Sequence, residues 1–100
     1  MLNIEKRFGE DTLIKVSGRI DTISAPDFEK AVDEVLEEAN SLVFDLARVE
    51  YISSAGLRVI LKAQKVMGNK GKMKIINVPE AVREIFDITG FSDFLTIEDK

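Results

Sequence analysis

Residues 42–67 of the chain, LVFDLARVEYISSAGLRVILKAQKVM, contain the change of pattern that decides the fold. The apolar run that opens this stretch ends in Asp45 and predicts a buried strand, which a linking segment follows. From Leu57 onward, apolar residues recur at intervals of three and four, which indicates a helix. The sequence therefore predicts a strand and then a helix, with Ser53 and Ser54 at the point where one pattern replaces the other.

A helical wheel drawn through the first turn of this helix separates the two serines. At roughly 100° per residue, Ser53 falls on the apolar side and Ser54 on the polar side, one turn before Arg58 and two before Lys62. We therefore expect Ser53 to cap the helix or pack inward, and Ser54 to face solvent. Capping alone would explain a serine at a helix start. A functional role for Ser54 is favoured by the two cationic residues on the same side of the helix, Arg58 and Lys62.

The apolar arc of the same helix is broader than a sheet-covering helix needs, because Val59 and Val66 lie toward its edge. Two interpretations stay open. The two valines pack on a neighbouring helix, or they are exposed beside Ser54 and offer an apolar anchor to a partner protein.

The composition is that of a single domain, residues 1–100. With 45% hydrophobic residues, a chain of 100 residues can bury over about 60% of its unfolded surface. The formal net charge of −4 argues against nucleic acid as a partner, because phosphate backbones are bound by basic surfaces. The charged N-terminal region excludes a signal peptide and no apolar run is long enough for a membrane span, so we expect no membrane partner and a cytoplasmic protein.

Upstream of the central stretch, the sequence predicts a hairpin and then a helix. Two short alternating runs flank a turn at residues 9–11, and Gly18 is expected to interrupt the chain after the second run. Ser24 followed by Asp27 resembles a capping box with the shorter acid, and apolar residues recur at helical spacing from Phe28 onward. We expect the acidic face of this helix to be solvated surface.

Downstream, residues 73–78 predict a strand that is too apolar to be exposed on both faces and so is typical of a central parallel strand. Pro79 is expected to begin a third helix and Gly90 to end it, and residues 94–97 predict a last short strand. The order is then β-β-α-β-α-β-α-β. It predicts an α/β fold with a mixed, largely parallel sheet that is covered by helices and carries a hairpin at one end.

Catalysis finds little support in the sequence. The chain has no His, Cys or Trp, which excludes histidine-based triads, thiol nucleophiles and most zinc sites. Asp21 and Asp45 both lie near predicted strand ends and could meet at one rim of the sheet, but an Asp at a strand end is usually a turn or cap residue. We therefore expect no catalytic residue, no metal and no cofactor.

Three segments of the chain carry a family pattern: residues 45–59, which are the most specific, and residues 16–21 and 79–90. Together these segments resemble the STAS-domain family of bacterial anti-sigma factor antagonists. By this resemblance, which covers nearly the whole chain, Ser54 takes the place of the serine that a partner kinase phosphorylates. Ser53 stands where many family members have Asp, which leaves open modification at that neighbouring hydroxyl. The family's C-terminal helix finds no room before Lys100, so that helix is expected to be missing or very short.

The resemblance implies a switched binding protein. The unphosphorylated form is expected to bind an anti-sigma factor that is a serine kinase, and so to free a sigma factor. Phosphorylation of Ser54 then releases the anti-sigma factor from the chain, and a serine phosphatase restores the unphosphorylated form. A STAS-type scaffold or accessory subunit of a signalling or transport assembly, without a phospho-switch, is the alternative. The residues expected to contact the partner are Asp21, Ser53, Ser54, Ala55, Gly56, Arg58, Val59 and Lys62.

Overall fold

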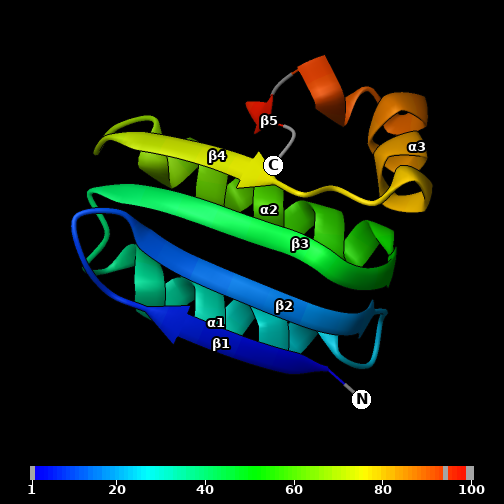
Figure 1. Cartoon of the computed structure of the whole chain (residues 1–100), viewed down its shortest axis with the longest axis horizontal. Helices are drawn as coiled ribbons and strands as arrows, with labels where there is room; N and C mark the ends of the chain where they lie inside the picture. The colour runs from blue at the N-terminus through cyan, green and yellow to red at the C-terminus, as the bar shows by residue number, and fades with distance from the viewer. Residues whose placement is uncertain (1, 94, 99–100) are drawn as a thin grey trace.

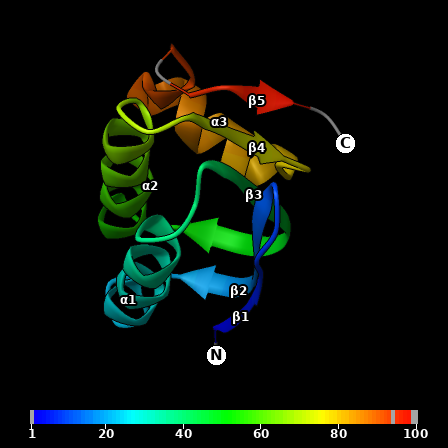
Figure 2. The same cartoon turned by 90° about the vertical axis from the view of Figure 1, so that its left-hand side faces the viewer.

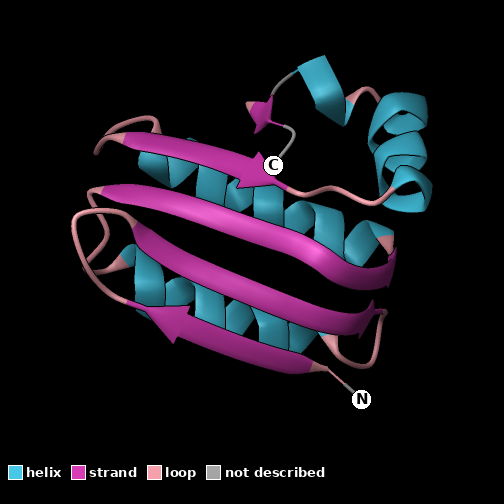
Figure 3. Ribbon diagram, in the orientation of Figure 1, coloured by secondary structure: helices cyan, strands magenta, loops and turns pink. Residues whose placement is uncertain are grey.

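Five strands pair side by side in sequence order in a computed structural model that describes residues 2–93 and 95–98. The first two strands are antiparallel and the later neighbours are parallel, so the predicted mixed sheet with a hairpin at one edge is confirmed (Figures 1 and 3). The elements are β1 (Asn3–Arg7), β2 (Thr12–Ile20), α1 (Ala25–Leu36), β3 (Ser41–Ile52), α2 (Ser54–Met67), β4 (Lys72–Ile76), α3 (Glu80–Thr89), a 3₁₀ turn (Phe91–Asp93) and β5 (Ile97–Glu98).

The core lies between the sheet and two of the helices. Both α1 and α2 cover the same face of the sheet (Figure 2). Phe28 of α1 meets Phe44 of β3 edge to face, with ring centroids 6.1 Å apart, and Ile60 of α2 is fully buried in the same cluster. Full burial of such a side chain stabilises a fold by roughly 1.5–3 kcal/mol. This cluster therefore fixes α1 and α2 against the central strands.

Helix α3 takes a different place from the other two. It lies beyond the tip of β4, where it contacts β3 and the 3₁₀ turn (Figure 1). Val82 and Phe86 are its buried residues, so its apolar stripe packs at the end of the sheet and not across a face. Pro79 precedes the helix and Gly90 ends it with φ of 81°, as predicted.

Strand β2 runs through Gly18 to Ile20, so the interruption predicted at Gly18 is an irregularity within the strand and not its end. The pairing with β3 shifts here, because Gly18 lies opposite Val49 while Arg19 lies opposite Tyr51. A bulge of this kind absorbs one extra residue and bends the strand without ending it. Gly18 has φ of 106°, a conformation that glycine adopts without strain.

Strand β3 likewise continues past Asp45 to Ile52, so the predicted linking segment is strand. The Asp45 Oδ1 atom accepts hydrogen bonds from the Ala47 N–H at 3.1 Å and from the Asn77 side-chain amide at 3.2 Å. The carboxylate thus supports a second register shift of β3 and ties that strand to the segment after β4. Its role in the fold is structural.

The last strand differs from the predicted one. Strand β5 comprises Ile97–Glu98, whereas the prediction placed it at residues 94–97 and Phe94 lies outside the described residues. Leu95 is buried, and the Thr96 carbonyl accepts the Ile75 N–H at 2.8 Å. Within the described residues, no helix is both long and apolar enough to cross a lipid bilayer.

Replacing Gly56 tests how closely α2 approaches the sheet. A Cβ atom there would lie 2.5 Å from Ile20 Cγ2 and 2.8 Å from Ile52 Cγ1. We expect Gly56→Ala to lower the free energy of unfolding by about 1–3 kcal/mol, because the added methyl overpacks the contact. Urea denaturation measures this, with Gly9→Ala as control because a Cβ on Gly9 meets nothing closer than 3.9 Å. Equal midpoints for Gly56→Ala and the wild type would contradict the close approach.

Candidate functional site

The C-terminal ends of β2 and β3 bring two separate segments of the sequence together. Ile20 pairs with Ile52, and the Ser53 N–H donates a 2.7 Å hydrogen bond to the Ile20 carbonyl. The turn that follows β2 therefore lies beside the junction of β3 and α2. The candidate site is formed by these two segments and the first turns of α2.

The two serines at the junction face opposite ways. Ser53 is the N-cap of α2, is 9% exposed, and its Oγ accepts a 3.4 Å hydrogen bond from the Gly56 N–H. Ser54 is the first residue of the helix and is exposed. The predicted orientation of both side chains is confirmed, and only the Ser54 hydroxyl is open to another molecule.

The two cations behind Ser54 are not equivalent. Lys62 Nζ lies 3.0 Å from a Glu29 oxygen and 2.9 Å from an Asp33 oxygen, both on α1. The hydrogen bond to Asp33 contributes most to raising the pKa of Lys62, and the bond to Glu29 acts in the same direction. Arg58 is exposed, and no carboxylate among residues 2–93 and 95–98 lies within ion-pair distance of it. The ammonium group of Lys62, a residue expected to contact the partner, is therefore already paired with two carboxylates of α1.

A shallow hollow of about 350 Å³ joins the β2–α1 turn to α2. Thr22 and Ala25 line one side of it, and Ala55, Arg58 and Val59 line the other. Val59 is only 5% exposed, so it packs within the structure and is not an open anchor beside the serine. Ser53 and Gly56, which were also expected to contact a partner, are likewise buried and support the surface from beneath. Val66 is half-buried against the core.

Asp21 organises the turn that follows β2. Its Oδ1 accepts the N–H of Ile23 at 3.1 Å and the N–H of Ser24 at 2.9 Å, and lies 3.1 Å from the Ser24 hydroxyl. The Ser24 N–H contributes most to lowering the pKa of Asp21, and the Ser24 hydroxyl and Ile23 N–H act in the same direction. Asp21 is half-buried, and its Oδ1 is directed into its own turn.

The predicted capping box at this turn is wrong. The Ser24 side chain makes no hydrogen bond to the helix N-terminus, because its hydroxyl lies 2.8 Å from the Arg19 carbonyl and accepts the Asp21 N–H at 2.9 Å. The first N–H of the helix, that of Ala25, donates to the Asp21 carbonyl at 2.8 Å. Ser24 thus closes the turn onto the end of β2.

Asp21 and Asp45 do not form a carboxylate pair. Asp45 lies within β3 opposite Lys15, whereas Asp21 follows the end of β2 six residues beyond Lys15. At about 3.3 Å per residue, this places the two carboxylates roughly 20 Å apart along the strands. The prediction that Asp45 lies at a strand end is therefore wrong.

Two exposed features of this end of the sheet were missed in the sequence. Ile23 projects from the turn, and the Arg19 guanidinium lies 4.6 Å from the centroid of the Tyr51 ring. An apolar residue inside a polar Asp-Thr-Ile-Ser turn, outside any strand or helix period, is a signal that could have identified Ile23.

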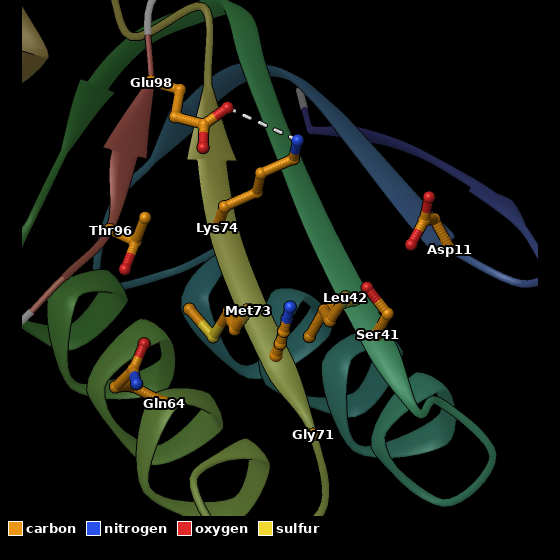
Figure 4. Close-up of a pocket in the computed structure, with 10 residues that line it drawn as sticks. Asp11, Ser41, Leu42, Gln64, Gly71, Met73, Lys74, Thr96 and Glu98 are labelled. Carbon is orange, nitrogen blue, oxygen red and sulfur yellow. Dashed lines mark hydrogen bonds and ion pairs between the residues drawn. The ribbon is translucent and has the colours of Figure 1, made fainter.

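A larger hollow, of about 480 Å³, lies at the opposite end of the sheet, where β3 and β4 begin (Figure 4). Met73, Gln64 and Thr96 line it, and an ion pair of 3.3 Å between Lys74 and Glu98 spans one side. Its lining includes none of the residues that the sequence selected as a site. The Ser54 end of the sheet therefore remains the candidate site.

Comparison with known proteins assigns the family. The family sequence model of the STAS domain matches residues 3–100 of this chain. The chain is 31% identical over 101 residues to the anti-sigma-B factor antagonist of Bacillus subtilis (strain 168), covering 99% of this chain and 93% of that protein. The chain therefore belongs to the STAS domain family.

Solved structures agree on the fold. An anti-sigma factor antagonist from Mycobacterium paratuberculosis superposes with a TM-score of 0.90 at 24% identity, covering 97% of this chain and 85% of that one. The anti-sigma factor antagonist SpoIIAA in its unphosphorylated form gives a TM-score of 0.80 at 16% identity, covering 100% and 88%. At these identities the likeness supports the fold alone.

The hydrogen bonds of Asp21 predict a pH-dependent contribution to stability. Because its pKa is lowered in the folded chain, the carboxylate stabilises the fold above its ordinary pKa of 3.8, and this contribution is lost as the pH falls through the lower folded value. We expect Asp21→Ala to lower the urea midpoint at pH 7, with a difference from the wild type that shrinks below pH 3.8. Asp11→Ala, at an exposed acid of the β1–β2 turn, is the control. A difference that persists unchanged in acid would contradict the assigned role.

Proposed function

We propose that the chain is an anti-sigma factor antagonist that is switched by phosphorylation of Ser54. The unmodified chain binds an anti-sigma factor that is also a serine kinase, and this frees a sigma factor to join RNA polymerase. The kinase phosphorylates Ser54 and thereby releases the chain, and a serine phosphatase restores the binding form. Membership of the STAS domain family, and the name of the 31% identical relative, support this assignment.

The observation that carries the proposal is the exposed hydroxyl of Ser54 at the first position of α2. Its neighbour Ser53 is buried and bonded to the Gly56 N–H, so a kinase can reach one serine and not the other. The structural relative SpoIIAA has been solved in a phosphorylated form, with a TM-score of 0.74, so the same fold accommodates a phosphorylated state.

The free energies that a phosphate on Ser54 would gain or lose favour a switch that acts at the partner interface and not on the fold. A phosphate at a helix N-terminus gains roughly 0.3–1 kcal/mol from the helix dipole, and Arg58 one turn away adds a modest amount. Placed inside an interface, the same phosphate must lose its water, at a cost of several kcal/mol. Because about 1.4 kcal/mol is tenfold in affinity, a loss of about 3–4 kcal/mol weakens binding a hundredfold or more.

Labelling of serine variants tests the assigned hydroxyl. We expect incubation with ATP and candidate anti-sigma factor kinases to label the wild type and Ser53→Ala on Ser54, and to leave Ser54→Ala unlabelled but still bound to the kinase. Mass spectrometry maps the label, and Ser53→Ala also loses about 1 kcal/mol of stability with its cap. Label that persists in Ser54→Ala would move the site to Ser53. No label with any kinase would favour the scaffold function.

Phosphorylation is expected to leave the fold intact. Since Ser54 is exposed and the helix-dipole gain is small, the free energy of unfolding changes by less than about 1 kcal/mol between the two forms. Urea denaturation of the unmodified and the phosphorylated chain measures the difference. A large shift in midpoint or in the slope of the transition would indicate refolding, and would contradict a switch by local charge.

A further inference from the structure

The turn between β2 and α1 presents one isoleucine to solvent on a fixed backbone. Ile23 is 89% exposed, although its own N–H donates to Asp21 Oδ1 at 3.1 Å and the next N–H donates to the same oxygen at 2.9 Å. The Ser24 hydroxyl, 2.8 Å from the Arg19 carbonyl, closes the turn from the other side. A backbone held in this way loses little further freedom on binding, which favours affinity.

The turn that carries Ile23 lies at the same end of the sheet as Ser54. The residue before Ile23, Thr22, lines the hollow that Ala55 and Arg58 of α2 line from the other side. The turn and the start of α2 lie at the same end of the sheet (Figure 1), where the Ser53 N–H bonds the Ile20 carbonyl. A partner that covers Ser54 and Arg58 would therefore extend onto Ile23.

Resting on the proposed function, we infer that Ile23 is the apolar anchor that enters a pocket of the anti-sigma factor, and that Asp21 is a positioning residue for it. The buried Val59 cannot supply such an anchor, and the other apolar residues that line the hollow, Ala25, Pro26 and Ala55, have smaller side chains than isoleucine. Asp21 Oδ1 is hydrogen-bonded to two N–H groups of the turn and so fixes its backbone, while Ile23 is the apolar side chain that the turn exposes. The anchor would lie at the same end of the sheet as Ser54.

Titration of purified variants against the cognate anti-sigma factor tests this assignment. The probes are the serine-kinase anti-sigma factors of the same organism, purified and titrated by calorimetry with the full chain. We expect Ile23→Ser to weaken binding roughly tenfold to hundredfold, as loss of a buried aliphatic anchor does, with an unchanged urea midpoint because the side chain is exposed in the free chain. Phe8→Ser is the matched control, since Phe8 is 54% exposed in the β1–β2 turn at the other end of β2.

Two substitutions of Asp21 separate positioning from direct contact. Asp21→Asn keeps an acceptor oxygen for the turn and removes the charge, so it is expected to bind within about threefold of the wild type, whereas Asp21→Ala loosens the turn and binds more weakly. Binding of Ile23→Ser within twofold of the wild type would overturn the anchor. Equal losses in Asp21→Asn and Asp21→Ala would overturn the positioning role and indicate a direct charge contact. A wild-type chain that binds none of these factors would instead refute the proposed function, and the inference with it.

Discussion

The close packing of the first turn of α2 on the ends of β2 and β3 is the contact on which the site depends. Gly56 allows it, because any Cβ there would collide with Ile20 and Ile52. With the helix seated so closely, the Ser53 N–H reaches the Ile20 carbonyl and the Ser53 side chain faces inward. One residue later, the helical turn directs the next hydroxyl to solvent. The exposure of Ser54 is thus a consequence of packing beneath it.

The surface around that hydroxyl is held in place before any partner arrives. Two carboxylates of α1 hold Lys62 of α2, and Asp21 closes the turn that leads into α1. Each surface ion pair contributes little to stability, but together these contacts fix the relative position of the two segments. A charge added to such a surface changes what can dock there more than it changes the fold. This is why the proposed switch needs no large rearrangement.

The order of elements and the opposite orientation of the two serines were predictable from the sequence, because both follow from local periods. The apolar spacing after Leu57 fixes the phase of α2, and the phase decides which serine faces inward. Most of the misses involve residues far apart in the chain; the capping box at Ser24 is a local exception, because the Ser24 hydroxyl bonds back to Arg19 and Asp21. Strand pairing across bulges carries β2 past Gly18 and β3 past Asp45, and the partners of Lys62 lie on another helix. A wheel drawn for one helix contains none of this information.

The central claim is that one exposed hydroxyl decides whether the anti-sigma factor can bind. The most direct measurement is calorimetric titration of the cognate factor with the unmodified chain and with the chain phosphorylated only on Ser54. The account predicts a dissociation constant at least about a hundredfold higher for the phosphorylated chain, since a doubly charged group must be desolvated in the interface. Equal affinities of the two forms would contradict it.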